Sequence, residues 1–223
     1  MSKFGLKCLV KILAVIISFL IHGMADRAAD RKDIRYALEM VRSELVTNAE
    51  QVREIHDYLV QERKSAEYLL EHCASLDKCP ADSVSFHGSM IRADLPVTLS
   101  SNASDMLKAS SVPQMIGDEK LLMQIIRAYD TCTWISSNQD RRMEARNNRF
   151  ELFVNDRSTF SSGGTVDFPV FMKTVPGRYA VKWITNQPDP SIIADVTDIQ
   201  DAIEGIDRFL ALKPLPVRKL RLL

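Results

Sequence analysis

Apolar residues recur with a period of 3.5 along the segment from residue 34 to residue 73. The repeat has spacings of four and three, at Ile34, Leu38, Val41, Leu45, Asn48, Val52, Ile55, Leu59, Glu62, Ala66, Leu69 and Cys73. A heptad period kept over this length predicts a helix that supercoils with a partner helix. The partner comes either from this chain or from a second copy.

Two polar residues, Asn48 and Glu62, occupy positions of this apolar stripe. Buried polar residues at heptad positions can set the register and the choice of partner. The alternative is that the helix contacts are looser at these two positions. The sequence leaves both interpretations open.

A second long helix is predicted from Asp118, which has the side chain of an N-cap, to about Phe153. Its predicted seam is Leu122, Ile125, Tyr129, Cys132, Ser136, Gln139, Met143, Arg146 and Phe150. The simplest arrangement packs this helix antiparallel on the first, so that residues 26–153 form a helical hairpin. The first helix then lacks an apolar cover from Ile34 to Val52, unless a C-terminal helix or another subunit supplies one.

The remaining segments are shorter. Residues 80–117 are rich in Ser, Asp and Pro, and predict a loop-rich cap with one short helix at 103–109. In the small C-terminal region, residues 154–223, β-branched and aromatic residues in VDFPVFM and GRYAVKWIT predict a small strand pair. A final helix is predicted at 198–212 behind a Thr197/Gln200 capping box, followed by a basic tail. The expected fold is mainly α-helical, with a small irregular or β-containing C-terminal part.

The first 25 residues predict either a membrane anchor or a cleaved signal peptide. Residues 12–21 are apolar except for Ser18, and three lysines precede them. The roughly 18 residues from Cys8 to Ala25 give about 27 Å of helix, close to the ~30 Å hydrocarbon thickness of a bilayer. Small residues before Asp26 suit a signal peptidase, but the chain continues with helix formers and no turn. The sequence therefore favours an uncleaved anchor and leaves cleavage open.

Basic residues flank the apolar segment on both sides, so charge does not decide its orientation. The close pair Cys73 and Cys79 is a candidate disulfide, and disulfides form in oxidising compartments. This pair favours a periplasmic body with the N-terminus in the cytoplasm.

Two stretches, KILAVIISFLIHGMADRAADRKDIRY and SSVPQMIGDEKLLMQIIRAYD, resemble a group of bacterial single-pass membrane proteins without known activity. The likeness covers roughly residues 4–75 and 105–150. It implies an inner-membrane anchor that leads to an extracytoplasmic helical hairpin. The chain departs from that pattern at His22-Gly23, where an exit rich in asparagine and tryptophan is expected, and this keeps signal cleavage open.

Composition narrows the function further. The chain has 29 Lys and Arg against 29 Asp and Glu, so no net field attracts it to nucleic acid. The sequence contains no G-x-S-x-G, Walker A, G-x-G-x-x-G or H-E-x-x-H motif, and only 4 histidines. We therefore predict no catalytic residues, no cofactor and no nucleic-acid partner.

Three groups of residues could still carry chemistry. One candidate zinc set is His72, Cys73, Cys79 and His87, although its spacing matches no common zinc module. A backbone nest for an anion could form at residues 161–164, where a flexible linker is the simpler interpretation. A charged helix face, either solvated or directed at phosphate headgroups, comprises Asp140, Arg141, Arg142, Glu144, Arg146 and Arg149.

These observations predict a membrane-anchored interaction or structural module that contacts lipid and either a protein partner or a second copy through the heptad seam. The alternative is an exported enzyme or small-ligand-binding protein, with its site in residues 80–117 or 153–183. A concave pocket with converging polar groups would favour the alternative.

Overall fold

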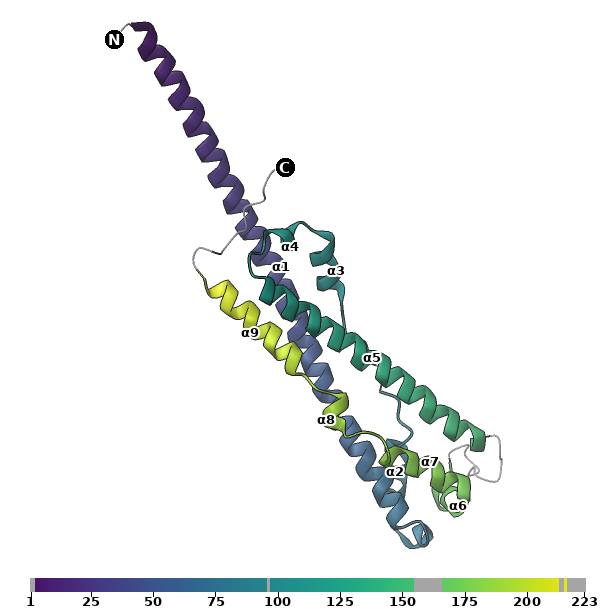
Figure 1. Ribbon diagram of the computed structural model, residues 1–223. Coiled ribbons are helices and arrows are strands. Elements are labelled where there is room, and N and C mark those ends of the chain that lie inside the picture. The colour runs from purple at the N-terminus through teal and green to yellow at the C-terminus, as the bar shows by residue number, and fades with distance from the viewer. Residues whose placement is uncertain (1–2, 96, 155–165, 213–214, 216–223) are drawn as a thin grey trace. The chain divides into compact units, whose positions relative to one another are not determined.

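The computed structural model describes residues 3–95, 97–154, 166–212 and 215, without the side chains of residues 3–27 and 151–154. Within these residues the chain is mainly helical, as predicted (Figure 1). The helices are α1 (Lys3–Glu71), η1 (Leu76–Lys78), α2 (Ala81–Met90), α3 (Asn102–Ala109), α4 (Val112–Met115), α5 (Glu119–Val154), α6 (Phe168–Lys173), α7 (Val175–Thr185), α8 (Pro190–Ile193) and α9 (Thr197–Ala211).

The chain forms two compact units, each assembled from segments far apart in the sequence. Unit 1 comprises Met1–Val46, Ser100–Tyr129 and Ile199–Leu223. Unit 2 comprises Thr47–Leu99 and Asp130–Asp198. The helices α1 and α5 each contribute residues to both units.

In unit 1 the apolar stripe of α1 is covered by helices of the same chain. Its members Ile34, Leu38, Val41 and Leu45 are fully buried. Helix α9 runs antiparallel along α1, because Arg42 binds Asp207 with Nε 2.5 Å from Oδ1, while Arg35 donates to the carbonyl of Leu210 at 3.3 Å. The predicted C-terminal helix therefore covers this part of the seam.

Glu44 ties three elements of unit 1 together. Its carboxylate accepts a hydrogen bond from Tyr129 Oη at 2.7 Å, which links α1 to α5. It also accepts from the backbone N–H of Ala103 at 3.1 Å, in the first turn of α3. An acidic side chain from another helix thus takes the place of a local N-cap, since Ser101 makes no capping bond with its side chain.

In unit 2 the same stripe continues and stays buried from Asn48 to Leu69. One apolar core in this unit combines α1, η1, α2, α5, α6 and α7. It contains Ala66, Leu69, Leu76, Val84, Ile91, Phe150, Phe168, Phe171, Met172, Ala180, Val181 and Ile184. The heptad positions predicted to be buried are therefore confirmed as a buried face in both units.

The predicted antiparallel hairpin is wrong, because α5 runs parallel to α1 within unit 2. Asn48 lies 3.6 Å from Cys132 Sγ, and Glu62 lies 3.3 Å from Arg146 Nη1. Partner numbers therefore rise together along the two helices. The chain returns to unit 1 between Leu99 and Ser100 before α5 begins, so α5 passes through the two units in the same order as α1.

The start of α5 is as predicted, because Asp118 Oδ1 accepts a hydrogen bond from the N–H of Leu121 at 3.0 Å. The predicted seam is only partly right. Its members Leu122, Ser136 and Met143 are half-buried, whereas the adjacent Leu121, Ala128, Ile135 and Arg142 are buried. In unit 1, α5 also packs on α9, where a Cβ on Gly205 would lie 2.6 Å from Gln124 Oε1. The same Cβ would lie 3.2 Å from Leu121, so this second contact accounts for the shifted face within unit 1.

The predicted strand pair is also wrong, because its two segments form α6 and α7. Asp167 caps α6 by accepting from the N–H of Val170 at 3.1 Å, and Thr174 caps α7 by accepting from Gly177 at 2.9 Å. The buried residues then recur with helical spacing, at Phe168, Phe171, Met172, Gly177, Ala180, Val181 and Ile184. Capping residues at both starts outweigh the β propensity of these segments.

The predicted helix at 198–212 is confirmed as α9, but its start differs from the predicted capping box. Asp195 Oδ1 accepts hydrogen bonds from both the N–H and the hydroxyl of Thr197, at 2.8 and 2.6 Å. Within the residues whose side chains are described, no helix has an apolar stretch long enough to cross a bilayer. The predicted anchor, residues 1–25, lies outside the described side chains.

We predict that Leu45→Ala and Leu59→Ala destabilise the protein by similar amounts, about 2–5 kcal/mol each. Both side chains are at most 2% exposed, and each is covered by elements of the same chain. Urea unfolding of the full chain in detergent, followed by circular dichroism, measures the effect. Tyr36→Ala is the control, because Tyr36 is 64% exposed. A loss at Leu59 alone would mean that α9 does not cover α1.

Candidate functional site

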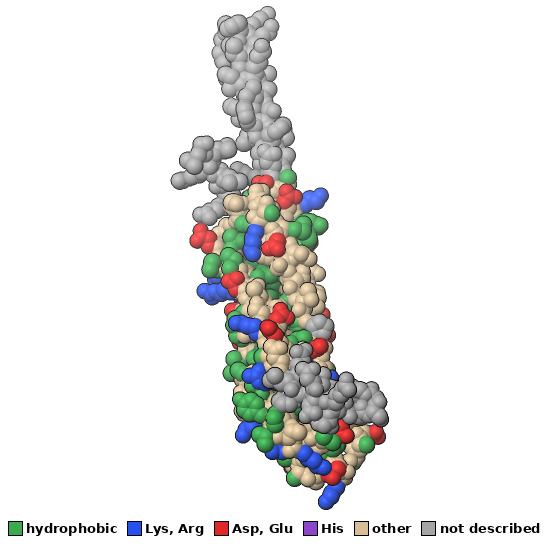
Figure 2. All heavy atoms as spheres, turned by 90° about the vertical axis from the view of Figure 1, so that its right-hand side faces the viewer, with side chains coloured by type: hydrophobic (Ala, Val, Ile, Leu, Met, Phe, Trp, Pro, Cys, Tyr) green, Lys and Arg blue, Asp and Glu red, His purple; other side chains and the backbone are tan. Residues whose placement is uncertain are grey.

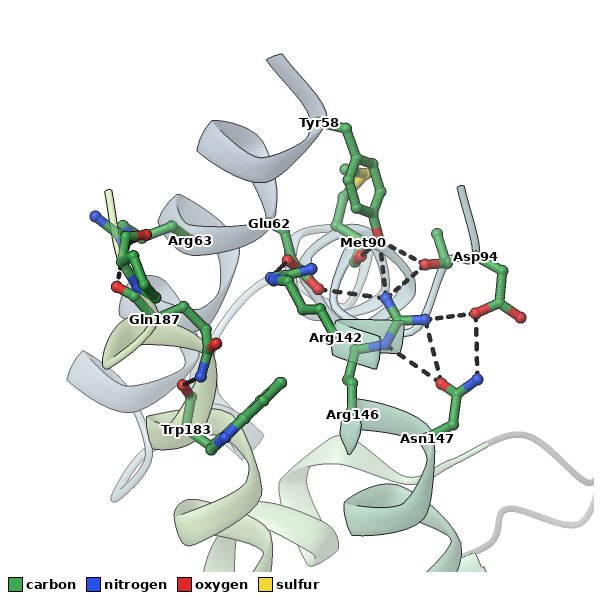
Figure 3. A network of polar contacts seen from close by, with 12 residues as sticks. Tyr58, Glu62, Arg63, Met90, Asp94, Arg142, Arg146, Asn147, Trp183 and Gln187 are labelled. Atoms are coloured by element: carbon green, nitrogen blue, oxygen red, sulfur yellow. Dashed lines mark hydrogen bonds and ion pairs between the residues drawn. The ribbon is translucent and has the colours of Figure 1, made fainter. Parts of the chain in front are cut away.

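A buried polar network in unit 2 centres on Glu62 of α1, which is fully buried (Figure 3). Arg142 and Arg146 reach Glu62 from α5, and Arg142 donates to its Oε2 atom. Arg146 is also fully buried and donates to Tyr58 Oη at 2.9 Å. A carboxylate thus stands between two guanidinium groups inside the unit.

The network extends to the end of α2. Arg146 donates to the carbonyl of Ala93 at 2.7 Å and to Asp94 Oδ1 at 2.5 Å. Tyr58 donates to the same carbonyl at 2.5 Å, and burial together with the charge of Glu62 raises the pKa of Tyr58. The network therefore fixes the chain just after α2 against both α1 and α5.

These contacts decide two questions that the sequence left open. Asn48 and Glu62 are fully buried and have polar partners on α5, so the seam is not loose at these positions. The charged face of α5 is only partly solvated, because Arg142 and Arg146 point into the unit. The other four members lie at the surface or are half-buried, and Arg149 stacks 4.5 Å from the Trp183 ring centre.

The described part of the face shown in Figure 2 has no single-sign or purely hydrophobic patch that would mark a functional surface. On the side shown in Figure 2, Lys and Arg side chains are interspersed with Asp, Glu and hydrophobic ones. A site is therefore to be sought in the concave parts of each unit.

Unit 2 has a cleft of ≈ 720 Å³, which we name the α2–α6 cleft. Its lining residues come from η1, α2, the segment after α2 and the start of α6: Leu76, Asp77, Cys79, Ala81, Val84, Ser85, Gly88, Ser89, Arg92, Ala93, Val166, Asp167, Phe168 and Pro169. Leu76, Val84 and Phe168 belong to the buried core and form an apolar wall. Gly88 allows α2 to approach this wall, since a Cβ there would lie 2.3 Å from the Phe168 ring.

The charged groups of the cleft differ in whether they have ion-pair or hydrogen-bond partners. Asp77 pairs with Lys173 at 3.8 Å, and Asp167 accepts the N–H of Val170. Arg92 is exposed and forms no ion pair among the described residues. The cleft therefore offers an apolar wall and one cation, Arg92, that no described carboxylate pairs with.

The predicted zinc residues do not come together as a ligand set. The Tyr68 ring lies between the imidazoles of His72 and His87, with ring centres 4.4 and 4.1 Å away. Burial and the nearby His72 lower the pKa of His87, which bonds Ser65 Oγ at 3.1 Å. Among the described residues, no three His, Cys, Asp or Glu side chains lie so that they could hold a metal ion.

Cys73 and Cys79 are unpaired thiols in this structure, both half-buried. Cys79 lines the α2–α6 cleft and lies 3.6 Å from the carbonyl of Ser75. The disulfide between them stays a prediction. The candidate anion nest at residues 161–164 lies outside the described residues.

The two regions named for a ligand site do meet, since the cleft is lined by residues from both 80–117 and 153–183. Its individual residues were not predicted. Gly88 within a helix is the one local signal, because glycine inside a helix often marks a close approach. Arg92 carried no signal in the sequence.

Comparisons of the chain with protein families, with curated proteins and with solved structures find no match. The resemblance to bacterial single-pass membrane proteins therefore stays a prediction. Function has to be inferred from the geometry of unit 2 and from the sequence.

We predict that Glu62→Gln destabilises the protein by about 3 kcal/mol, because it leaves the buried Arg142 without a carboxylate and Arg146 with only the exposed Asp94. Thermal and urea unfolding of the full chain measure the loss. Glu67→Gln, the same change at an exposed position of α1, should stay within about 0.5 kcal/mol of the parent. Equal effects of the two substitutions would contradict a central role for Glu62.

Proposed function

We propose that this chain is a membrane-tethered binding protein that takes up a small anionic amphiphile in the α2–α6 cleft. The observation that carries the proposal is the cleft itself, whose ≈ 720 Å³ lies within the roughly 300–1,000 Å³ range of small-molecule sites. Its predominantly apolar wall and few polar groups are typical of such sites.

The charges of the cleft select the class of ligand. Arg92 has no acidic partner among the described residues, whereas Asp77 pairs with Lys173 and Asp167 accepts a backbone N–H. A guanidinium group binds a carboxylate through two parallel hydrogen bonds. The apolar wall of Leu76, Val84 and Phe168 then suits a hydrocarbon or aromatic body attached to that carboxylate.

The proposal is for binding rather than catalysis. Two of the three nucleophilic groups that line the cleft bond to nearby backbone carbonyls: Ser89 Oγ to Phe86 at 2.8 Å and Cys79 Sγ to Ser75 at 3.6 Å. The nearby His87 bonds Ser65 through Nδ1. A nucleophile and a base paired across the cleft would have favoured catalysis instead.

We infer the membrane tether from the apolar sequence of residues 12–21. The backbone of α1 is helical from Lys3 to Glu71, which agrees with an apolar segment that passes into the body without a turn. We place the tether in a bacterial inner membrane with the body in the periplasm. The alternative is export after cleavage of a signal peptide, with the same cleft and ligand class.

We do not propose that a second copy of the chain binds to the heptad seam. The seam was the reason to expect an oligomer, and its described members from Ile34 to Leu69 are buried by elements of the same chain. A protein partner elsewhere on the surface stays a prediction.

We predict that the full chain binds decanoate more tightly than decanol or decylammonium, since only decanoate places a negative charge at Arg92. Displacement of the fluorescent dye anilinonaphthalene sulfonate by each compound measures the affinities. Arg92→Gln should weaken decanoate binding about tenfold at low salt, which corresponds to about 1.4 kcal/mol. The affinity of Arg92→Lys for decanoate should lie between those of the parent and Arg92→Gln.

Two further variants separate the cleft from general effects. Ala81→Phe places a ring in the cleft from an exposed position of α2 and should abolish binding. Arg53→Gln removes a positive charge from an exposed position of α1 outside the cleft lining and should leave binding unchanged. Equal affinity for the three probes, or equal loss in both arginine variants, would contradict the proposal.

We predict that the protein in cells keeps its N-terminal residues and resists carbonate extraction from membranes. The apolar segment continues into α1 without a cleavage-site turn, so the anchor should not be released. Mass spectrometry of the purified protein checks the N-terminus. A soluble species that begins at Asp26 would show the signal peptide to be correct and would leave the ligand proposal intact.

A further inference from the structure

Two neighbouring side chains of α5 carry buried polar atoms without partners. Arg142 donates through Nη2 to Glu62, but its Nε and Nη1 atoms are buried with no hydrogen-bond partner. Gln139 is fully buried one turn earlier, and neither Nε2 nor Oε1 has a partner. Buried donors and acceptors are almost always satisfied in folded proteins. These atoms therefore indicate a bound guest.

A small cavity in unit 2 receives the Arg142 side chain. It is lined by Leu59, Arg63, Arg142, Ile184, Gln187, Pro188, Pro190 and Ile193. Its volume is ≈ 10 Å³, which is at the lower limit of the space that one water molecule requires, so only a guest of about that size fits. Larger oxyanions such as sulfate do not fit.

The unpartnered atoms favour an acceptor as the guest. Of the two side chains only Arg142 lines the cavity, and both of its unpartnered atoms, Nε and Nη1, are donors. A water molecule would bring two donors of its own to a site with a surplus of donors. A halide ion accepts hydrogen bonds and donates none.

The charged groups around the cavity also favour an anion as the guest. Glu62 is the fully buried carboxylate of the network and is shared by Arg142 and Arg146. Arg63 also lines the cavity. The remaining carboxylates, Asp94 beside Arg146 and Asp189 beside Arg63, are 58% and 59% exposed, so water screens their charge. The described lining of the cavity thus contains two arginines, Arg63 and Arg142, and no carboxylate.

We propose that unit 2 binds a single halide-sized anion, chloride under cellular conditions, at the unpartnered edge of Arg142 next to Arg63. Arg63 is itself held by the carbonyl groups of Gln187 and Pro188, at 2.6 and 2.8 Å. The ion therefore joins α5 to α1 and to the chain between α7 and α8. This site is separate from the α2–α6 cleft and does not depend on the proposed ligand.

The test compares the thermal unfolding of the full chain in detergent at constant ionic strength, with sodium chloride, bromide or gluconate. Ligands that bind the folded state raise the unfolding temperature with the logarithm of their concentration. The protein should unfold a few degrees higher in chloride and bromide than in gluconate, which is too large for the cavity. Chlorine NMR line broadening by the protein gives a second, independent readout.

Arg142→Met should remove both the halide dependence and the NMR broadening. Because this variant also weakens the Glu62 network, Arg63→Gln serves as a second variant with a milder change and should reduce halide affinity at least tenfold. Arg53→Gln, on an exposed position of α1, should keep the full response. Equal unfolding temperatures in all three salts and no broadening would overturn the proposal and mean that the cavity holds water only.

Discussion

The buried carboxylate of Glu62 is the constraint on which the geometry of unit 2 depends. Desolvating one carboxylate and two guanidinium groups costs several kcal/mol per ion, and only close pairing offsets that cost. The pairing holds α1 and α5 in one register through Arg142 and Arg146. Arg146 then extends the constraint to Ala93 and Asp94, directly after Arg92. A charge buried in the helix seam thus places the cation of the α2–α6 cleft.

Much of the fold could be predicted because the heptad stripe reports burial directly. Every described member from Ile34 to Leu69 is buried, and the long second helix and the C-terminal helix lie where their patterns place them. The direction of α5 could not be predicted in the same way. A seam shows which residues are buried, but an apolar stripe packs on a parallel or an antiparallel partner equally well.

A signal for the direction was present in the polar residues of the two seams. The pairs Asn48 with Cys132 and Glu62 with Arg146 are both 84 residues apart, which only parallel helices allow. An acid in one seam and an arginine in the other predict contact once their charges are considered together. The sequence contained less information about the cleft. Gly88 and Phe168 are distant in sequence, and Phe168 lies in a segment with β propensity. The capping contacts of Asp167 and Thr174 decide that segment, and capping is a local effect that hydrophobic patterns do not show.

The buried polar residues of the seam stabilise the fold less than apolar residues would, but they specify how α1 and α5 align. An apolar heptad seam can shift by seven residues and still bury the same kind of side chain. With such a shift Glu62 would face Gln139 instead of Arg146, and a buried guanidinium group would lose its carboxylate. The energetic penalty of that shifted state excludes it, whereas leucine in both positions would tolerate it. The buried ion pairs therefore fix the register of α1 and α5 beside the cleft. If α5 slid by one heptad, Arg146 would move about 10 Å along the helix axis and lose its contacts with Ala93 and Asp94.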